Sequence, residues 1–283
     1  MARLEFAGDD GDKFFREPDL ALVHGGPDFE TLSRSKNVRQ RKRAASESKM
    51  KLRRFTEARE VLSRYLPRTR LVRAASLEAN SKQKVFLKLE SEMPTGSFKV
   101  RGAIYALSVQ EQGGGVRKVV ASSTGNHGAA VAYAAQLLGW KARIFLPEKC
   151  NPVKRNNIAR LGAEIVEKGA LDSAAAFDAA DEYARESGAF FLNDATNPDL
   201  PAGPGTIACE IFEQQPDVAA IYVPMGDTAL IRGVAAAAKQ ISAKVKIIGV
   251  QSERAPAYFL SWKEGRVIPT DTCDTCADDG RAG

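Results

Sequence analysis

The most informative stretch of this sequence is Met93-Pro94-Thr95-Gly96-Ser97-Phe98-Lys99-Val100-Arg101-Gly102-Ala103. The run before it, Val85-Phe86-Leu87-Lys88-Leu89, is typical of a strand that enters a core. Pro94 cannot donate to a sheet ladder and Gly96 permits a turn, so these two residues end the strand. We therefore expect Lys99 to emerge at the carboxyl end of a strand, which is where ligands bind in open α/β sheets.

A lysine in a loop is most often simply solvated, so the neighbouring residues must decide its role. Here Pro94-Thr95-Gly96-Ser97-Phe98-Lys99, followed by Arg101-Gly102-Ala103, resembles the signature of the fold-type-II pyridoxal-phosphate enzymes. The likeness is to the branch of threonine/serine dehydratases (ammonia-lyases) and serine racemases, and it extends from about Phe55 to the last residues. The resemblance implies that Lys99 forms a Schiff base with pyridoxal 5'-phosphate, and the position of Phe98 places its ring near the cofactor.

The length and composition bound the class of protein. The chain has 283 residues, enough to bury a sizeable core in one large domain or in two ordinary ones. No apolar run approaches the roughly 18 residues of a membrane span, and the first residues lack the apolar centre of a signal peptide. These features predict a soluble, cytoplasmic protein without a membrane partner.

The formal net charge of +6 reflects basic residues that are bunched between Arg39 and Arg54. Residues 1–49 show no sustained helical or strand period, which favours a disordered or loosely attached leader. A basic leader can bind nucleic acid or act as a localisation signal, but we interpret it as a solvated tail and expect no nucleic-acid partner. Met50 lies where the family resemblance begins, so we hypothesise that it is the native start.

The sequence offers little metal or disulfide chemistry. Its four cysteines are too few and too scattered for a disulfide scaffold, so we expect free thiols. The pair Cys273 and Cys276 supplies only half of a four-ligand zinc site. Glu210 matches a carboxylate that binds a divalent cation in some family members, but the expected partner aspartate is replaced by Ala219. Since one carboxylate is not a site for a hard cation, we predict no functional metal.

Hydrophobic patterns predict an α/β fold. A helix is expected over 56–66, capped by Thr56 and stopped by Pro67. Strand and helix signals then alternate, which predicts parallel sheets with helices on both faces. The expected strands lie at 119–121, 142–146, 164–166, 190–192, 220–223 and 247–250. The expected helices lie near 127–138, 153–161, 172–187, 205–215 and 230–242.

The expected domain organisation follows from the family resemblance. Fold-type-II enzymes, which include the tryptophan synthase β-like fold, have two domains, each a mostly parallel twisted sheet flanked by helices. The smaller domain is inserted into the larger, and the cofactor lies between them. The resemblance places the small domain at 111–199 and the large cofactor-binding domain at 50–110 and 200–283. Relatives continue through further strands and helices, so we expect the large domain to be incomplete at its C-terminus.

A second constellation, Ser122-Ser123-Thr124-Gly125-Asn126-His127-Gly128, follows a strand and opens an alanine-rich helix. Backbone N–H groups at such a helix start attract an anion, although a capped helix start with nothing bound is the alternative. The segment is similar to the family's S-S-G-N-H loop, which implies that Asn126 hydrogen-bonds the phenolic oxygen of the cofactor. We interpret His127 as a loop-shaping residue. The residues implied to hold the substrate carboxylate are Ser123, Thr124, Gly125, Asn126 and His127.

A third loop, Pro224–Gly233, connects a strand to a helix at the place of the family's glycine-rich phosphate cradle. Backbone N–H groups can hold a phosphate there, although a plain strand-to-helix turn is the alternative. The family's run of glycines is reduced to Gly226, and Asp227 brings a negative charge close to the phosphate, while Thr228 offers a hydroxyl donor. The residues implied to bind the cofactor phosphate are Gly226, Asp227, Thr228, Ala229 and Leu230.

Position 124 bears on the reaction type. Serine racemases carry a serine there as a second acid/base, whereas this chain has Thr124, a bulkier hydroxyl with restricted χ1. Elimination needs no second base. We therefore predict a β-elimination in which Lys99 abstracts the α-proton of L-threonine or L-serine, giving a 2-oxo acid and ammonia. A racemase or a β-replacement enzyme is the alternative within the family, and a truncated non-catalytic remnant is the alternative outside it.

Dimers are common in this family, so a homodimer is one expected state.

Overall fold

The structure of the protein is a computed structural model, which describes residues 52–78, 83–114, 116–167, 172–266 and 268–269. The predictions for the leader 1–49, for a start at Met50 and for Cys273 and Cys276 lie outside the described residues. Among the residues that are described, no helix combines the length and the apolar character needed to cross a bilayer.

The chain divides into two compact units. One comprises Thr56–Pro204, and the other combines Met1–Phe55 with Gly205–Gly283. The main sheet of the first unit lies wholly within 111–199, the range expected for the small domain. The expected grouping of 50–110 with 200–283 in one large domain stays a prediction.

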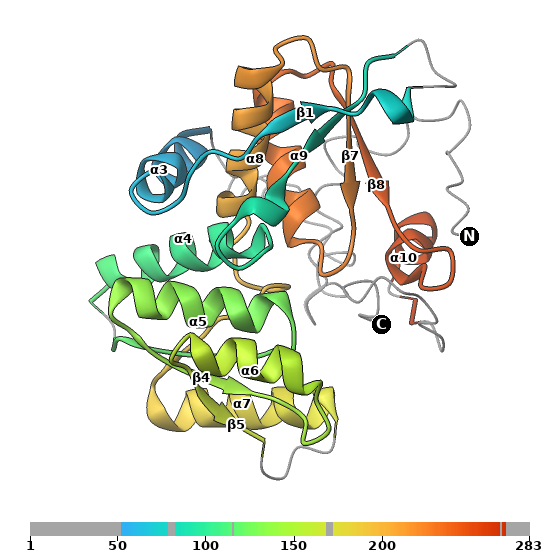
Figure 1. The fold of residues 1–283 in the computed structure, drawn as a ribbon. Helices are drawn as coiled ribbons and strands as arrows, with labels where there is room; N and C mark the ends of the chain where they lie inside the picture. Colours follow the sequence, from blue (N-terminus) through green and yellow to red (C-terminus); the bar gives the residue numbers. More distant parts are fainter. Residues whose placement is uncertain (1–51, 79–82, 115, 168–171, 267, 270–283) are drawn as a thin grey trace, which may run out of the picture. The chain divides into compact units, whose positions relative to one another are not determined.

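The first unit contains a four-stranded parallel sheet with the strand order β5-β4-β3-β6. Each strand and helix of this region that the sequence predicted is present. In Figure 1 the helices α5 and α7 lie on opposite faces of this sheet, which confirms the predicted parallel sheet between helices. The strands are β3 (Lys118–Ser122), β4 (Lys141–Phe145), β5 (Glu164–Val166) and β6 (Phe190–Phe191). The helices that alternate with them are α5 (Asn126–Leu138), α6 (Pro152–Arg160) and α7 (Ser173–Ser187).

The core of the first unit lies on both faces of β4, because successive side chains of a strand point to opposite sides. Ile144 is fully buried and faces α5 and α6, where it lies close to Gly128 and Ile158. The next residue, Phe145, packs on the other face in a cluster with Val120 of β3 and with alanines of α7. Small residues on α7 let the helix approach the sheet closely. The two faces of one strand therefore hold two separate layers of helices.

The strand before the lysine stretch belongs to a different sheet from the one expected. Strand β2 (Phe86–Lys88) pairs with β1 (Leu71–Arg73) in a two-stranded antiparallel sheet, so Lys99 does not follow a parallel strand. A short 3-10 helix, η4 (Glu90–Glu92), and a turn at Gly96, whose φ is +68°, separate β2 from the lysine.

Lys99 itself is the first residue of a helix, α4 (Lys99–Gln112). The helices predicted from the sequence do not include this one. All residues from Lys99 to Leu107 are buried, so this part of the helix has no solvated face and leaves no amphipathic period to detect.

Helix α3 (Leu52–Leu62) confirms the expected first helix but shifts its bounds. Thr56 lies inside the helix and is not its cap, and the helix ends before Pro67 is reached. Phe55, Ala58 and Leu62 are all buried at helical spacing, which explains why the helix begins before Thr56.

The second unit contains the parallel pair β7 (Ala220–Pro224) and β8 (Lys246–Val250), in which Ile221 lies opposite Ile247. Helix α9 (Ala229–Ile241) connects the two strands and buries Ile231 and Val234. Helix α8 (Ala202–Gln214) precedes β7, and α10 (Ala257–Glu264), which the sequence ranges do not include, follows β8. The strand-helix-strand order of this unit is the one that the sequence predicts.

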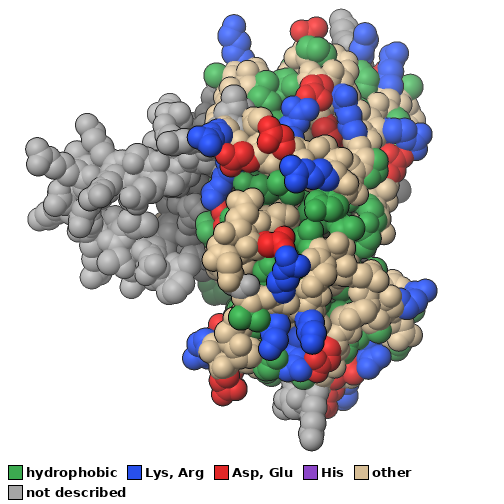
Figure 2. Space-filling view, turned by 90° about the vertical axis from the view of Figure 1, so that its left-hand side faces the viewer, with side chains coloured by type: hydrophobic (Ala, Val, Ile, Leu, Met, Phe, Trp, Pro, Cys, Tyr) green, Lys and Arg blue, Asp and Glu red, His purple; other side chains and the backbone are tan. Residues whose placement is uncertain are grey.

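Charged side chains of both signs are interspersed on the face drawn in Figure 2, in its upper and its lower parts. Arg143 and Glu164 form one of the ion pairs of the described residues, at 2.7 Å. On this face the described residues do not form one basic patch of the kind that focuses a field on nucleic acid. The absence of a nucleic-acid partner stays a prediction.

Replacing Ile144 with alanine tests the packing on one face of β4. The substitution removes a fully buried side chain between β4 and α5, and we expect the free energy of unfolding to fall by about 2–5 kcal/mol. Val153→Ala is the matched control, because Val153 is 67% exposed and its loss should change stability by less than about 0.5 kcal/mol. Urea unfolding followed by circular dichroism measures both. Equal effects of the two variants would contradict the assigned core.

Candidate functional site

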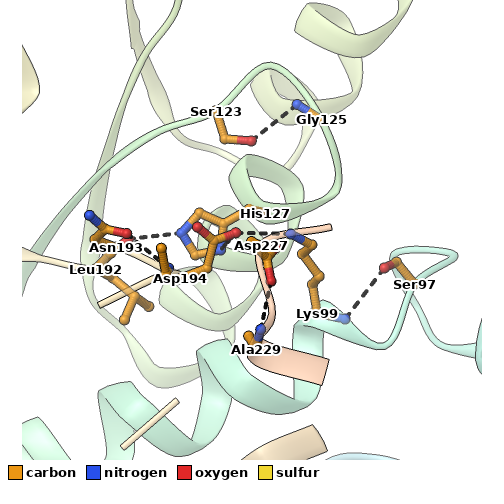
Figure 3. A network of polar contacts seen from close by, with 11 residues as sticks. Ser97, Lys99, Ser123, Gly125, His127, Leu192, Asn193, Asp194, Asp227 and Ala229 are labelled. Atoms are coloured by element: carbon orange, nitrogen blue, oxygen red, sulfur yellow. Dashed lines mark hydrogen bonds and ion pairs between the residues drawn. The ribbon is translucent and has the colours of Figure 1, made fainter. Parts of the chain in front are cut away.

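Lys99 is buried and carries its charge next to a carboxylate. Its side chain is 8% exposed, and its Nζ lies 2.9 Å from Oδ2 of Asp194 (Figure 3). A buried ammonium group is costly unless it is paired, so this contact accounts for the position of the amine. The ring of Phe98, the residue before the helix, lies 6.0 Å from Nζ. Lys99 is therefore a fixed, partly desolvated amine and not a solvated loop lysine.

Asp194 reaches the lysine from the end of the parallel sheet. It follows β6, the edge strand beside β3, and so lies at the carboxyl end of a parallel strand. Its Oδ2 also lies 3.6 Å from Nδ1 of His127, which comes from the first turn of α5. The same carboxylate therefore faces two basic side chains from two helices (Figure 3).

The ring of His127 is held in one orientation. Its Nε2 lies 2.8 Å from the backbone oxygen of Leu192, and a carbonyl oxygen only accepts, so Nε2 must carry a proton and donate it. His127 is 4% exposed and thereby ties α5 to the segment after β6. This contact fits the interpretation of His127 as a shaping residue. Its predicted place around the substrate carboxylate stays a prediction.

The loop before α5 folds back over the first turn of the helix. A Cβ atom at Gly128 would lie 2.4 Å from the backbone oxygen of Ser123, so only glycine permits this close approach. The hydroxyl of Ser123 accepts a hydrogen bond from the N–H of Gly125 at 3.2 Å. Asn126 is exposed, while Thr124 is half-buried. Backbone N–H groups at this helix start are suited to a carboxylate.

A buried ion pair holds the beginning of α4. Both Nε and Nη2 of Arg101 donate to Glu90, at 2.8 and 2.9 Å, and the Arg101 side chain is only 2% exposed. The hydroxyl of Thr69 donates to the same carboxylate at 2.7 Å, and Lys88 donates to the backbone oxygen of Thr69 at 2.8 Å. This network joins the chain before β1, the 3-10 helix η4 and the first turn of α4. It fixes the backbone from which Lys99 projects.

The predicted phosphate loop lies in the second unit, between β7 and α9. The carboxylate of Asp227 accepts a hydrogen bond from the N–H of Ala229 at 2.9 Å, so an anion of the chain itself lies at the first turn of α9 (Figure 3). Thr228 is buried and has a φ of +68°, a left-handed conformation that a β-branched residue rarely adopts. Gly226 and Leu230 flank this turn and are half-buried. The loop thus presents a helix start, with one of its N–H donors already used.

The sequence reasoning missed Asp194 and the Arg101–Glu90 pair. A signal for Asp194 was available, because it follows a correctly predicted strand whose carboxyl end is the ligand edge of a parallel sheet. No comparable signal marks the pair, since Glu90 and Arg101 come together only when β2 and α4 are placed.

Glu210 is buried, as is Thr206 in the same helix. Within the described residues no group of three metal-ligating side chains occurs.

Comparisons with known proteins identify one enzyme family. The family model described as "Pyridoxal-phosphate dependent enzyme" matches residues 62–283. The L-threonine ammonia-lyase of Thermotoga maritima is 36% identical over 222 residues, which are 78% of this chain and 55% of that protein. The serine racemase of Arabidopsis thaliana is 32% identical over 226 residues, 80% of this chain and 68% of that protein. The chain spans about half the length of the threonine ammonia-lyases that it matches.

Solved structures share the fold. Maize serine racemase superposes with a TM-score of 0.77 at 30% identity, over 83% of this chain and 71% of that chain. The processed form of threonine deaminase isoform 2 from Solanum lycopersicum gives a TM-score of 0.75 at 30% identity, over 80% and 62% of the two chains. These matches confirm the predicted α/β fold and the resemblance carried by the lysine stretch.

Arg101→Met tests the buried ion pair. The variant keeps an apolar side chain of similar length but leaves the carboxylate of Glu90 without its guanidinium partner. We expect a loss of about 3–5 kcal/mol in the free energy of unfolding. Arg70→Met is the control, because Arg70 also pairs with a glutamate, Glu92, while its side chain is 71% exposed, and its loss should change the free energy of unfolding far less. Denaturant titrations compare the two, and similar losses would refute the special role of the buried pair.

Proposed function

The chain belongs to the family of pyridoxal-phosphate-dependent enzymes, and we propose that it is an ammonia-lyase that dehydrates and deaminates a hydroxy amino acid such as L-threonine or L-serine. The observation that carries this proposal is the buried, carboxylate-paired amine of Lys99, within the family's signature stretch. Curated relatives named L-threonine ammonia-lyase support the reaction class.

The residues of both units suit the chemistry of the cofactor. Lys99 supplies the primary amine that an aldehyde requires, and its backbone is fixed by the Arg101–Glu90 pair. The start of α9 offers backbone donors to a phosphate, although Asp227 already occupies one of them. Asn126, exposed at the start of α5, is proposed to hydrogen-bond the phenolic oxygen of the cofactor. We therefore propose Lys99, Phe98, Asn126 and the loop Gly226–Leu230 as the cofactor-binding residues.

When bound, pyridoxal phosphate would supply an electron sink that makes the α-proton of the substrate acidic. The residues of the chain then act on that substrate. The start of α5, with the loop Ser123–His127, receives the carboxylate. Lys99, once its amine is free, accepts the α-proton as a general base. The β-hydroxyl would take up one proton and leave as water, and hydrolysis by another water would release a 2-oxo acid and ammonia.

A serine racemase is the second candidate function. Maize and Arabidopsis serine racemases are among the similar proteins, at 30% and 32% identity. Racemisation needs an acid/base on the second face of the substrate, and the hydroxyl available for that role is that of the half-buried Thr124. Chiral analysis of the amino acid recovered from an L-serine incubation separates the two candidates, because only a racemase produces D-serine.

The compartment and the assembly are also proposals. Among the described residues, neither Cys150 nor Cys209 takes part in a disulfide, and we propose a cytoplasmic compartment, where disulfides are rare. A homodimer stays a prediction that rests on the family resemblance.

Lys99→Ala tests the proposed reaction. Release of 2-oxo acid from L-threonine or L-serine, measured after addition of pyridoxal phosphate, should fall at least about a hundredfold because the base and the cofactor-bonding amine are both lost. Lys141→Ala is the control, since Lys141 is an exposed lysine of β4 in the same unit, and its turnover should match the wild type. Unchanged turnover in Lys99→Ala rejects the mechanism. A wild-type chain that releases neither 2-oxo acid nor ammonia would support the alternative of a non-catalytic remnant.

Asp227→Asn tests the phosphate loop. Asparagine can still accept the hydrogen bond from the N–H of Ala229 but carries no charge, so a phosphate at the start of α9 meets less repulsion. We expect pyridoxal phosphate to bind about two- to fivefold more tightly to this variant. Asp217→Asn, at an exposed position of the same unit, should leave the dissociation constant unchanged. Equilibrium titration followed by absorbance measures both, and weaker binding by Asp227→Asn would argue against a phosphate at this loop.

A further inference from the structure

The carboxylate of Asp194 is a chemical partner of Lys99 that the proposed function does not use. The distance of 2.9 Å between Nζ and Oδ2 is that of a charge-assisted hydrogen bond, and the two side chains are 8% and 21% exposed. Solvent screening is weak for such a buried pair, so the negative charge strongly favours the ammonium form of Lys99.

Two basic groups that face Asp194 come from two different helices. Lys99 approaches from α4, and His127 approaches from α5 with Nδ1 at 3.6 Å. This second distance is longer than a hydrogen bond, and the ring is already held through Nε2 by the backbone oxygen of Leu192. His127 is therefore held independently of Lys99, while Lys99 is in direct contact with the carboxylate.

The ammonium form has opposite effects on the two steps that the amine performs. Before condensation the ammonium must give one proton to solvent. The nitrogen then bonds the aldehyde carbon, and the carbonyl oxygen leaves as water with the two remaining protons of the amine. A neighbouring carboxylate hinders this step because it stabilises the ammonium. In α-proton abstraction the amine becomes an ammonium, so the same carboxylate favours that step.

We propose that Asp194 is a positioning residue that raises the proton affinity of Lys99, slowing capture of the cofactor and strengthening the lysine as a base. The proposal rests on the proposed function for its second half only, because the proton affinity of Lys99 is a property of the chain without cofactor. It assigns to Asp194 a role in the reaction through Lys99 and without contact to the substrate.

Asp194→Asn removes the charge and keeps the size of the side chain. In the full chain before cofactor is added, the titration midpoint of Lys99, followed by NMR with labelled lysine and assigned with Lys99→Ala, should fall by about one pH unit or more. Capture of pyridoxal phosphate, followed by its visible absorption band, should then reach half its maximal rate at a correspondingly lower pH. Turnover of L-threonine should fall about tenfold or more.

Two further variants separate a chemical role from a structural one. Asp194→Glu restores the charge and should return the Lys99 midpoint toward the wild-type value, even if the asparagine variant folds poorly. Asp178→Asn removes an exposed aspartate of α7 in the same unit and should change neither midpoint nor turnover. An unchanged titration midpoint of Lys99 in Asp194→Asn overturns the proposal. Slower capture of pyridoxal phosphate by this variant at every pH also overturns it. A wild type without a visible band overturns the proposed function, whereas the Lys99 midpoint still decides the role of Asp194.

Discussion

The buried pair between Arg101 and Glu90 is the interaction on which the placement of the reactive lysine depends. Two parallel hydrogen bonds join the first turn of α4 to the 3-10 helix η4, and Thr69 extends the network to the chain before β1. A guanidinium that is 2% exposed cannot exchange its partner for water without a large loss in free energy. The backbone of Lys99, two residues earlier, is therefore fixed by this ion pair and by the packing of the buried residues of α4.

The parallel sheet of the same unit supplies the other half of the site. Strands β3 and β6 are neighbours, so the residues that follow them meet at one edge of the sheet. His127 comes from the helix after β3, and Asp194 comes from the segment after β6. Gly128 lets the loop after β3 lie against the first turn of α5. The topology of the sheet thus brings a histidine and a carboxylate together from distant parts of the sequence.

Much of this arrangement was predictable from the sequence. The alternation of short apolar runs with helical segments identifies the strands from 119 to 250 and the helices between them. The lysine stretch identifies the family. The helix α4 was not predictable in this way, since nine consecutive residues from Lys99 to Leu107 are buried and the polar periodicity is absent. The contact between Lys99 and Asp194 depends on strand order, which local patterns do not specify.

The separation of Lys99 and Asp194 along the chain has a consequence for folding. The two residues are 95 positions apart, and the parallel sheet of the first unit lies between them in sequence. Contacts between such distant residues form only after the entropy of closing a long loop has been overcome, so they belong to the late stages of folding. In a nascent or partly folded chain, Lys99 is an ordinary solvated lysine among many. The contact with Asp194 forms only when the sheet is complete, so the raised proton affinity proposed for Lys99 belongs to the folded chain and not to its folding intermediates.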